Sequence, residues 1–343
     1  MRVAFAIAGL VVLAVAAAAS AGSSSSTALT LRTSGPVVAL AADGQRAALT
    51  VRRRGRWQIL VWEPAAHRVL TIHTESDADP GESVALAGTR VAWDDWWGGL
   101  TLETRVSSAT IARRSAVSLG SDESTDGGPG VEFLAPGGDG KLLAFTEQFR
   151  CGDEECPPGH RQGDVVDATI WRAAPRGRCS TSLNDFRREG HCARVATAHG
   201  KLTVLDVDAG RIAARTDDGV RLLTAAGRSL LDVPVRNVSG AALSGNRLAV
   251  RVPGSFEIYD AGSGELLDTI PGQSRERLED LQGGILVSAT GKTVTLRRLS
   301  DGHSAHFHAA GYARARLEHP GLFFAGGRRV TFTPMADVLR RFG

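Results

Sequence analysis

Three short polar stretches combine the residue types that bind ligands on protein surfaces. Arginine, tryptophan and carboxylate side chains gather in them, and two cysteines bracket the third stretch. Trp and Arg are enriched at binding hot spots, and a Trp beside carboxylates can stack on and hydrogen-bond a sugar. The candidate ligand-binding residues are Arg53, Arg54, Arg56, Trp57, Asp94, Asp95, Trp96, Trp97, Asp153 and Glu154.

Motifs for catalysis are missing from the sequence. Gly291-Lys292-Thr293 resembles the end of a phosphate-binding loop, but Leu286 stands where that loop needs glycine, and a strand pattern follows. His306 and His308 would face the same way on a strand, and with His303 in the preceding turn they form a cluster that could bind a transition metal. The alternative, histidines in water on a polar outer strand, is favoured. We expect no catalytic residue, no metal and no cofactor.

Composition limits the classes of function. The 343 residues are 43% hydrophobic, so the chain can fold around a core. Forty basic against 37 acidic residues give a net charge of +3, a bias too weak to favour a nucleic acid partner. The basic residues are nearly all Arg, and with abundant Ala and Gly this indicates a high-GC bacterial genome rather than a function.

The N-terminus has the features of an export signal. A basic start, the apolar stretch Val3–Ala19 and the small residues Ala19-Ser20-Ala21 predict a signal peptide over residues 1–21, with an uncleaved anchor as the alternative. Residues 22–35 then form a flexible leader that includes a possible ring-closing strand at Ala28–Arg32. We therefore expect a secreted or cell-envelope protein that meets a membrane only through an uncleaved leader.

The remainder, residues 36–343, repeats one unit about every 40 residues. Each unit has an apolar strand, a turn with Gly, and a second apolar strand; weaker third and fourth strands follow. The turns carry a basic residue in most units, as in Gly245-Asn246-Arg247. Seven such units are found, with second strands at residues 47–49, 91–93, 142–145, 212–214, 248–250, 285–287 and 322–324. Four short antiparallel strands per unit predict an all-β protein, a seven-bladed β-propeller.

This pattern resembles the seven-bladed propeller superfamily of WD40-like and TolB-like repeat proteins. The resemblance covers nearly all of residues 27–343, but it is architectural. The Gly-His and Trp-Asp signatures of WD40 repeats are missing, and the one Trp-Asp pair, Trp93-Asp94, ends a second strand, which is the wrong place. The resemblance therefore carries over a fold and no functional residues.

All four cysteines lie in an enlarged third unit. The interval from Lys141 to Arg211 is 70 residues, roughly 30 more than the ~40-residue repeat. It is interpreted as loop insertions over residues 149–195, with a hidden eighth blade as the alternative. The loop between the second and third strands and the loop between the third and fourth strands lie at opposite ends of a blade. Cysteines in different loops would be too far apart to bond, so disulfides within each loop are favoured. The expected pairs are Cys151–Cys156 and Cys179–Cys192.

The candidate ligand-binding residues all follow second strands of units one to three. Equivalent loops of adjacent blades emerge on one face of the disc, so these side chains should share one sector of a rim. The alternative is that Trp93, Trp96 and Trp97 fill gaps between blades while the charges pair. We expect a monomeric, non-catalytic module that binds a protein or an envelope glycan. A metal-dependent propeller hydrolase or lactonase, with carboxylates converging on the central channel, is the second hypothesis.

Overall fold

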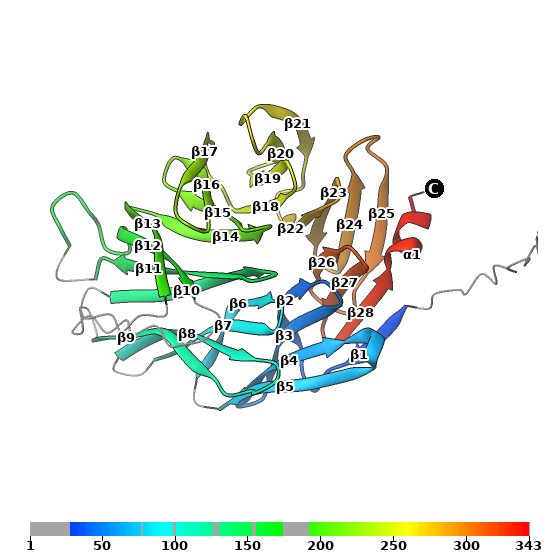
Figure 1. Cartoon of the computed structure of the whole chain (residues 1–343), viewed down its shortest axis with the longest axis horizontal. Helices are drawn as coiled ribbons and strands as arrows, with labels where there is room; N and C mark the ends of the chain where they lie inside the picture. Colours follow the sequence, from blue (N-terminus) through cyan, green and yellow to red (C-terminus); the bar gives the residue numbers. More distant parts are fainter. Residues whose placement is uncertain are drawn as a thin grey trace, which may run out of the picture.

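The structure, a computed structural model, describes residues 28–76, 78–98, 101–125, 130–152, 156–173 and 192–342, and the side chains of residues 97–98, 101–102 and 122–125 lie outside the description. Most of the described chain is β-strand. Seven antiparallel sheets of four strands are arranged around a central axis (Figure 1). The predicted all-β fold, a seven-bladed propeller, is confirmed, and an eighth blade is not formed by the described residues.

Each blade runs outward from the axis in chain order. Blade one contains β2 (Val37–Asp43), β3 (Arg46–Arg53), β4 (Arg56–Glu63) and β5 (Arg68–Glu75). Blade two contains β6 (Asp79–Ala87), β7 (Arg90–Gly98), β8 (Thr101–Thr110) and β9 (Val117–Thr125). Blade three contains β10 (Gly130–Asp139), β11 (Leu142–Arg150), β12 (Val165–Ala173) and β13 (Cys192–His199). Blade four contains β14 (Leu202–Asp208), β15 (Arg211–Thr216), β16 (Gly219–Thr224) and β17 (Ser229–Pro234).

The remaining blades follow the same plan. Blade five contains β18 (Gly240–Ser244), β19 (Arg247–Val252), β20 (Ser255–Asp260) and β21 (Leu266–Pro271). Blade six contains β22 (Arg277–Gln282), β23 (Ile285–Thr290), β24 (Thr293–Arg298) and β25 (Ser304–His308). Blade seven contains β26 (Arg314–Glu318), β27 (Gly321–Gly326), β28 (Arg329–Pro334) and, from the other end of the chain, β1 (Leu29–Arg32). Two short helices, η1 (Pro64–Ala66) and α1 (Met335–Arg340), complete the elements.

The ring closes where the two ends of the chain meet. β1 pairs antiparallel with β28, with Leu29 opposite Phe332 and Arg32 opposite Arg329, so the first strand completes the last blade (Figure 1). This pairing covers a sheet edge that would otherwise be open to intermolecular pairing. After β28 the chain ends in α1, whose Val338 is buried in the apolar cluster between blades six and seven.

The hydrophobic core is divided among the blade interfaces. Seven apolar clusters are found in the described chain, one between each pair of adjacent blades around the ring. The second strands have continuous apolar runs because they pack against neighbours on both faces; β27, for example, is buried throughout. Outer strands such as β21 are mostly exposed. Each blade is therefore held by its neighbours, and the loops rest on a rigid frame.

Tight turns join the first and second strands of each blade. In blade four the two-residue turn Ala209-Gly210 has positive φ at both positions, as a type I′ hairpin requires. In most other blades the first turn residue is a glycine with positive φ, as at Gly44, Gly140 and Gly245, which explains the turn glycines that recur in the sequence. None of the helices in the described part of the chain has the length and apolar content to cross a lipid bilayer.

Candidate functional site

The alternating course of the strands gives the disc two different faces. The turns between second and third strands and the connections between blades lie on one face, here called the loop face. The turns between first and second strands lie on the opposite face, here called the ring face. The turns of the hairpins β3–β4, β7–β8 and β11–β12 all lie on the loop face, so the three predicted stretches share that face.

Five arginines from blades one and seven surround an open hollow on the loop face. Its volume is about 980 Å³, and we call it the arginine hollow; its lining residues are Gly35, Pro36, Arg52, Arg53, Arg54, Gly55, Arg56 and Arg328. All five arginine side chains are exposed. The sequence placed Arg53, Arg54 and Arg56 here, whereas Arg328 comes from the hairpin of blade seven, which joins them only when the ring closes.

Gly35 lies where the backbone of the hollow is tightest. A Cβ at this position would stand 1.9 Å from the carbonyl oxygen of Arg52, so a side chain cannot fit without moving β3. We expect Gly35→Ala to lower the free energy of unfolding by about 2 kcal/mol, in the range of other overpacked sites. Urea denaturation measures this loss. Gly240→Ala, where a Cβ would meet only contacts of 3.8 Å or longer, is the control, and an equal loss in both variants would contradict the steric explanation.

Trp57 does not contact solvent as a ligand-binding residue must. Its side chain is 1% exposed, and its indole Nε1–H donates to the carbonyl oxygen of Ala78 at 2.8 Å. Its ring lies 5.5 Å from that of His73, which in turn stacks on Trp93 at 5.1 Å. Burial between these rings lowers the pKa of His73. The assignment of Trp57 as a ligand contact is therefore corrected: it anchors the blade-one hairpin to blade two.

Asp95 is buried beneath the predicted surface. It is 1% exposed, and its carboxylate accepts two hydrogen bonds from Arg105, both at 2.9 Å. Burial raises the pKa of Asp95, and the guanidinium opposes this rise. Trp93 is fully buried on the same side of β7. For these two residues the structure agrees with the alternative in which tryptophan fills the gap between blades and the charge is paired.

Trp96 and Asp94 face the other way, into a groove between blades two and three. Trp96 is 43% exposed and lines this groove, which has a volume of about 390 Å³. Burial raises the pKa of Asp94 to about 6, although its carboxylate accepts a 3.0 Å hydrogen bond from the Ser83 N–H. The groove, here called the Trp96 groove, is lined by Gly81, Asp94, Asp95, Trp96, Thr104, Glu132, Phe133, Leu134, Gln148 and Arg150.

The blade-three wall of the Trp96 groove is a polar network. Glu132 accepts hydrogen bonds from Gln148 at 2.6 Å and from Arg150 at 3.1 Å. Arg150 also donates to the carbonyl oxygen of Gly163 at 2.7 Å, which ties the groove to the loop between β11 and β12. These donors and acceptors line the same groove as Trp96, a combination that can hold a polar ring. Glu132, Gln148 and Arg150 were not among the predicted residues, because they lie on strands before the loop.

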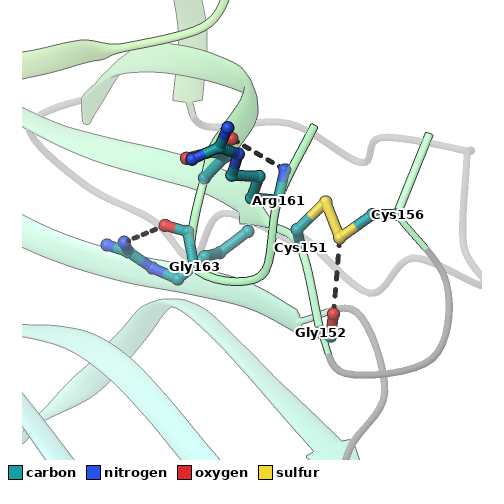
Figure 2. Close-up of a disulfide and its surroundings, with 7 residues drawn as sticks. Cys151, Gly152, Cys156, Arg161 and Gly163 are labelled. Atoms are coloured by element: carbon teal, nitrogen blue, oxygen red, sulfur yellow. Dashed lines mark hydrogen bonds between the residues drawn. A yellow bond between two sulfur atoms is a disulfide. The ribbon is translucent and has the colours of Figure 1, made fainter. Parts of the chain in front are cut away.

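The loop after β11 carries the disulfide between Cys151 and Cys156, whose Cα atoms are 5.1 Å apart (Figure 2). The backbone of Cys151 also bonds to the far side of the loop, with its N–H donating to Asp164 at 2.9 Å and its carbonyl accepting from Gly163 at 3.0 Å. The loop is thus closed twice at its base. Asp153, Glu154 and Cys179 lie outside the described residues, as does the side chain of Trp97, so their roles and the Cys179–Cys192 pair stay predictions.

The mouth of the central channel on the loop face was not predicted. It encloses about 660 Å³ and is lined by the charged residues Glu82, Arg251, Arg275, Glu276, Arg277, Glu279, Arg314 and Arg316. Beside it, the exposed ring of Tyr312 is flanked by the guanidinium carbons of Arg277 at 4.0 Å and Arg314 at 5.3 Å. Most of the other arginines here donate hydrogen bonds to backbone carbonyls. Arg251 by itself donates to four of them.

Carboxylates from five blades converge at the other end of the channel, on the ring face. We call them the carboxylate ring: Asp43, Asp139, Asp206, Asp208, Asp280 and Glu318. Each accepts a backbone N–H from another blade: Asp43 from Gly88 and Gly140, Asp139 from Ala209, Asp206 from Leu243, Asp208 from Gly245, Asp280 from Leu317, and Glu318 from Gly44. Ser244 and Gln282 complete the circle between blades five and six.

The convergence of these carboxylates resembles what the hydrolase hypothesis requires, but their oxygens hold the blades together. Within the described residues, no three His, Cys, Asp or Glu side chains are arranged to hold a metal ion. The predicted histidine cluster lies on and before β25, where His306 and His308 are exposed and contact Thr295 and Thr293. Their positions agree with the favoured interpretation, in which the histidines lie in water on a polar outer strand.

Comparisons with known proteins give a fold and no family. No protein-family model matches the sequence, and no curated protein matches it. A chain of the mitotic checkpoint complex has a TM-score of 0.56 at 13% identity, covering 89% of this chain and 93% of that chain. An oligogalacturonate lyase in complex with manganese has a TM-score of 0.52 at 9% identity, with coverages of 90% and 96%. BamB from Moraxella catarrhalis has a TM-score of 0.45 at 11% identity, with coverages of 86% and 84%.

Likeness at such low identity concerns architecture alone. The predicted seven-bladed propeller architecture is confirmed at that level, because the sheets, their order and the ring closure agree with the fold. The chain is a seven-bladed β-propeller with a structurally diverse loop face.

Proposed function

We propose that this protein is an exported, non-catalytic β-propeller that acts as a binding or scaffold module of the bacterial cell envelope. Its ligand is a protein or an envelope glycan, bound on the loop face of blades one to three. The observation that carries the proposal is the Trp96 groove, which is lined by the exposed Trp96 and by a preformed hydrogen-bonding network. Aromatic stacking combined with fixed polar partners is the usual chemistry of such sites.

Two features support export. Residues 1–21 have the pattern of a signal peptide. The disulfide between Cys151 and Cys156 suits an oxidising compartment, because cytosolic proteins of ordinary bacteria rarely keep structural disulfides. Recognition on loops held by a rigid scaffold fits the fold, and a structurally similar chain belongs to a multiprotein complex. The metal-dependent hydrolase or lactonase hypothesis has less support, since the channel carboxylates are used as acceptors between blades.

Replacing Trp96 by alanine tests the proposed site. We expect Trp96→Ala to reduce recovery of envelope material in a pull-down at least about tenfold, because truncating a hot-spot tryptophan typically costs 2 kcal/mol or more. The fold should be unchanged, since the side chain lies on the surface. Protease or glycosidase treatment of the envelope material before the pull-down separates a protein ligand from a glycan.

Leu267→Ala serves as the matched control for this experiment. Leu267 is 49% exposed on the outer strand of blade five, so it removes a similar exposed apolar side chain far along the ring. Equal recovery with Trp96→Ala and wild type would contradict the proposed site. Metal analysis of the purified protein tests the second hypothesis independently, because stoichiometric calcium or zinc would favour an enzyme.

A further inference from the structure

The arginine hollow gathers five exposed arginine side chains on one small area of the surface. Arginines elsewhere on the molecule can share one carboxylate; Arg46 and Arg68, for example, both contact Glu63. In the hollow, Arg52 contacts Asp79 at 2.7 Å through exposed side chains. Among the described residues, the other four arginines of its lining have no ion-pair partner, and no acidic residue lines it. Like charges gathered in this way favour the binding of an anion.

The backbone beneath the arginine hollow is fixed. The N–H of Thr33 donates to Arg328 at 3.0 Å, the N–H of Val37 to Gly327 at 2.8 Å, and the N–H of Arg52 to Pro36 at 2.9 Å. These bonds join the hairpins of blades seven and one through the connection between them. The guanidinium groups therefore extend from a preformed frame, which reduces the ordering cost of binding.

The shape and chemistry of the hollow select one class of ligand. A concave surface does not match a flat bilayer, and a protein interface would need an apolar centre that this lining of arginine, glycine and Pro36 lacks. Single-stranded nucleic acid binds by stacking on aromatic rings, and the nearby Trp57 is buried. We propose that the arginine hollow binds a linear anionic polysaccharide, whose acidic groups accept paired hydrogen bonds from the guanidinium forks.

The hollow and the Trp96 groove are neighbours on the loop face. Arg52 of the hollow contacts Asp79 at the start of β6, and Gly81 of the same strand lines the groove. One extended polysaccharide can therefore place its acidic groups in the hollow and a sugar ring against Trp96. This inference rests on the proposed function of the loop face and assigns the charge of its ligand.

The test uses a variant of three exposed arginines, R53Q/R54Q/R328Q, in the full chain. We expect the wild type to bind alginate, a linear carboxylated polysaccharide, and to bind neutral dextran much more weakly. The variant should bind alginate at least about tenfold more weakly, and the slope of log affinity against log salt should fall by about three, roughly one ion per contact removed. The control R113Q/R172Q/R228Q removes the same charge from exposed positions elsewhere and should bind as the wild type does.

Several outcomes would overturn the proposal. Equal binding of alginate by R53Q/R54Q/R328Q and wild type would show that the hollow is not the binding site. An equal loss of alginate binding in the control would show that the effect comes from net charge alone. Tighter binding of duplex DNA or polyglutamate than of alginate at the same ionic strength would assign another class of partner. Trp96→Ala separates the two proposals. Normal recovery of envelope material with that variant would contradict ligand binding at the Trp96 groove. The alginate measurements would still decide whether the arginine hollow binds a polysaccharide.

Discussion

Replacing Arg105 by methionine should destabilise the protein more than any other single change considered above. We expect Arg105→Met to lower the free energy of unfolding by about 3–5 kcal/mol, the usual cost of leaving a buried charge without its partner. Asp95 is 1% exposed and receives both of its 2.9 Å hydrogen bonds from Arg105. Methionine fills much of the same space but donates no hydrogen bond. Urea denaturation at neutral pH measures the loss.

The pH dependence of this loss identifies its cause. Without Arg105, burial should raise the pKa of Asp95 further above its ordinary value of 3.8. A folded-state pKa above the unfolded value means that stability falls as pH rises between the two. The difference in the free energy of unfolding between Arg105→Met and wild type should therefore be small near pH 4 and large near pH 7.5. A difference of equal size at both pH values would show that lost packing, not the charge, is responsible.

Two further variants serve as controls for Arg105→Met. The double variant D95N/R105M removes both charges and should regain much of the lost stability. Arg221 and Asp232 form an exposed ion pair, with side chains 35% and 61% accessible, so Arg221→Met should cost less than about 1 kcal/mol. The comparison separates the buried pair on the loop face from an ordinary surface pair.

The fold was predictable because its signals are local. Each hairpin carries its own apolar strands and turn residues, as Gly245-Asn246-Arg247 does between β18 and β19. Repetition of such units leaves few architectures other than a propeller. The partner of β1 was harder to predict, because Leu29 and Phe332 are some 300 residues apart and no local pattern links them. Helix α1 was not foreseen, since six residues carry no measurable helical period.

The candidate site was predictable as a place but not as a set of orientations. Along β7 the two-residue period turns the side chains of Trp93 and Asp95 to one side of the blade, where both are buried, and those of Asp94 and Trp96 to the other side. That alternation was present in the sequence and could have separated buried from exposed members. The flanking of Tyr312 by Arg277 and Arg314 could not be found this way, because Arg277 belongs to blade six and Arg314 to blade seven. Such contacts depend on how neighbouring blades pack.

The carboxylate ring makes stability depend on pH in the opposite direction from ordinary salt-bridged carboxylates. Burial, together with nearby carboxylates, raises the pKa of Asp206 to about 7 and of Glu318 to about 8; burial also raises the pKa of Asp280 to about 6. The folded state therefore binds protons more tightly than the unfolded chain. We expect the free energy of unfolding to fall as pH rises from about 5 to about 8, because ionised carboxylates then face one another across the channel.

Glu318→Gln should remove part of this pH dependence. The glutamine carbonyl can still accept the 3.1 Å hydrogen bond from the Gly44 N–H, while the charge that opposes Asp280, Asp43 and Asp139 is gone. The free energy of unfolding of the variant, measured by urea denaturation, should equal that of the wild type near pH 5, where Glu318 is protonated. Near pH 8.5 it should exceed the wild-type value by about 1–3 kcal/mol. Asp268→Asn, at an exposed carboxyl on β21, is the control and should change neither value. A variant less stable than wild type at pH 8.5 would mean that the ionised Glu318 holds blades seven and one together, rather than repelling its neighbours.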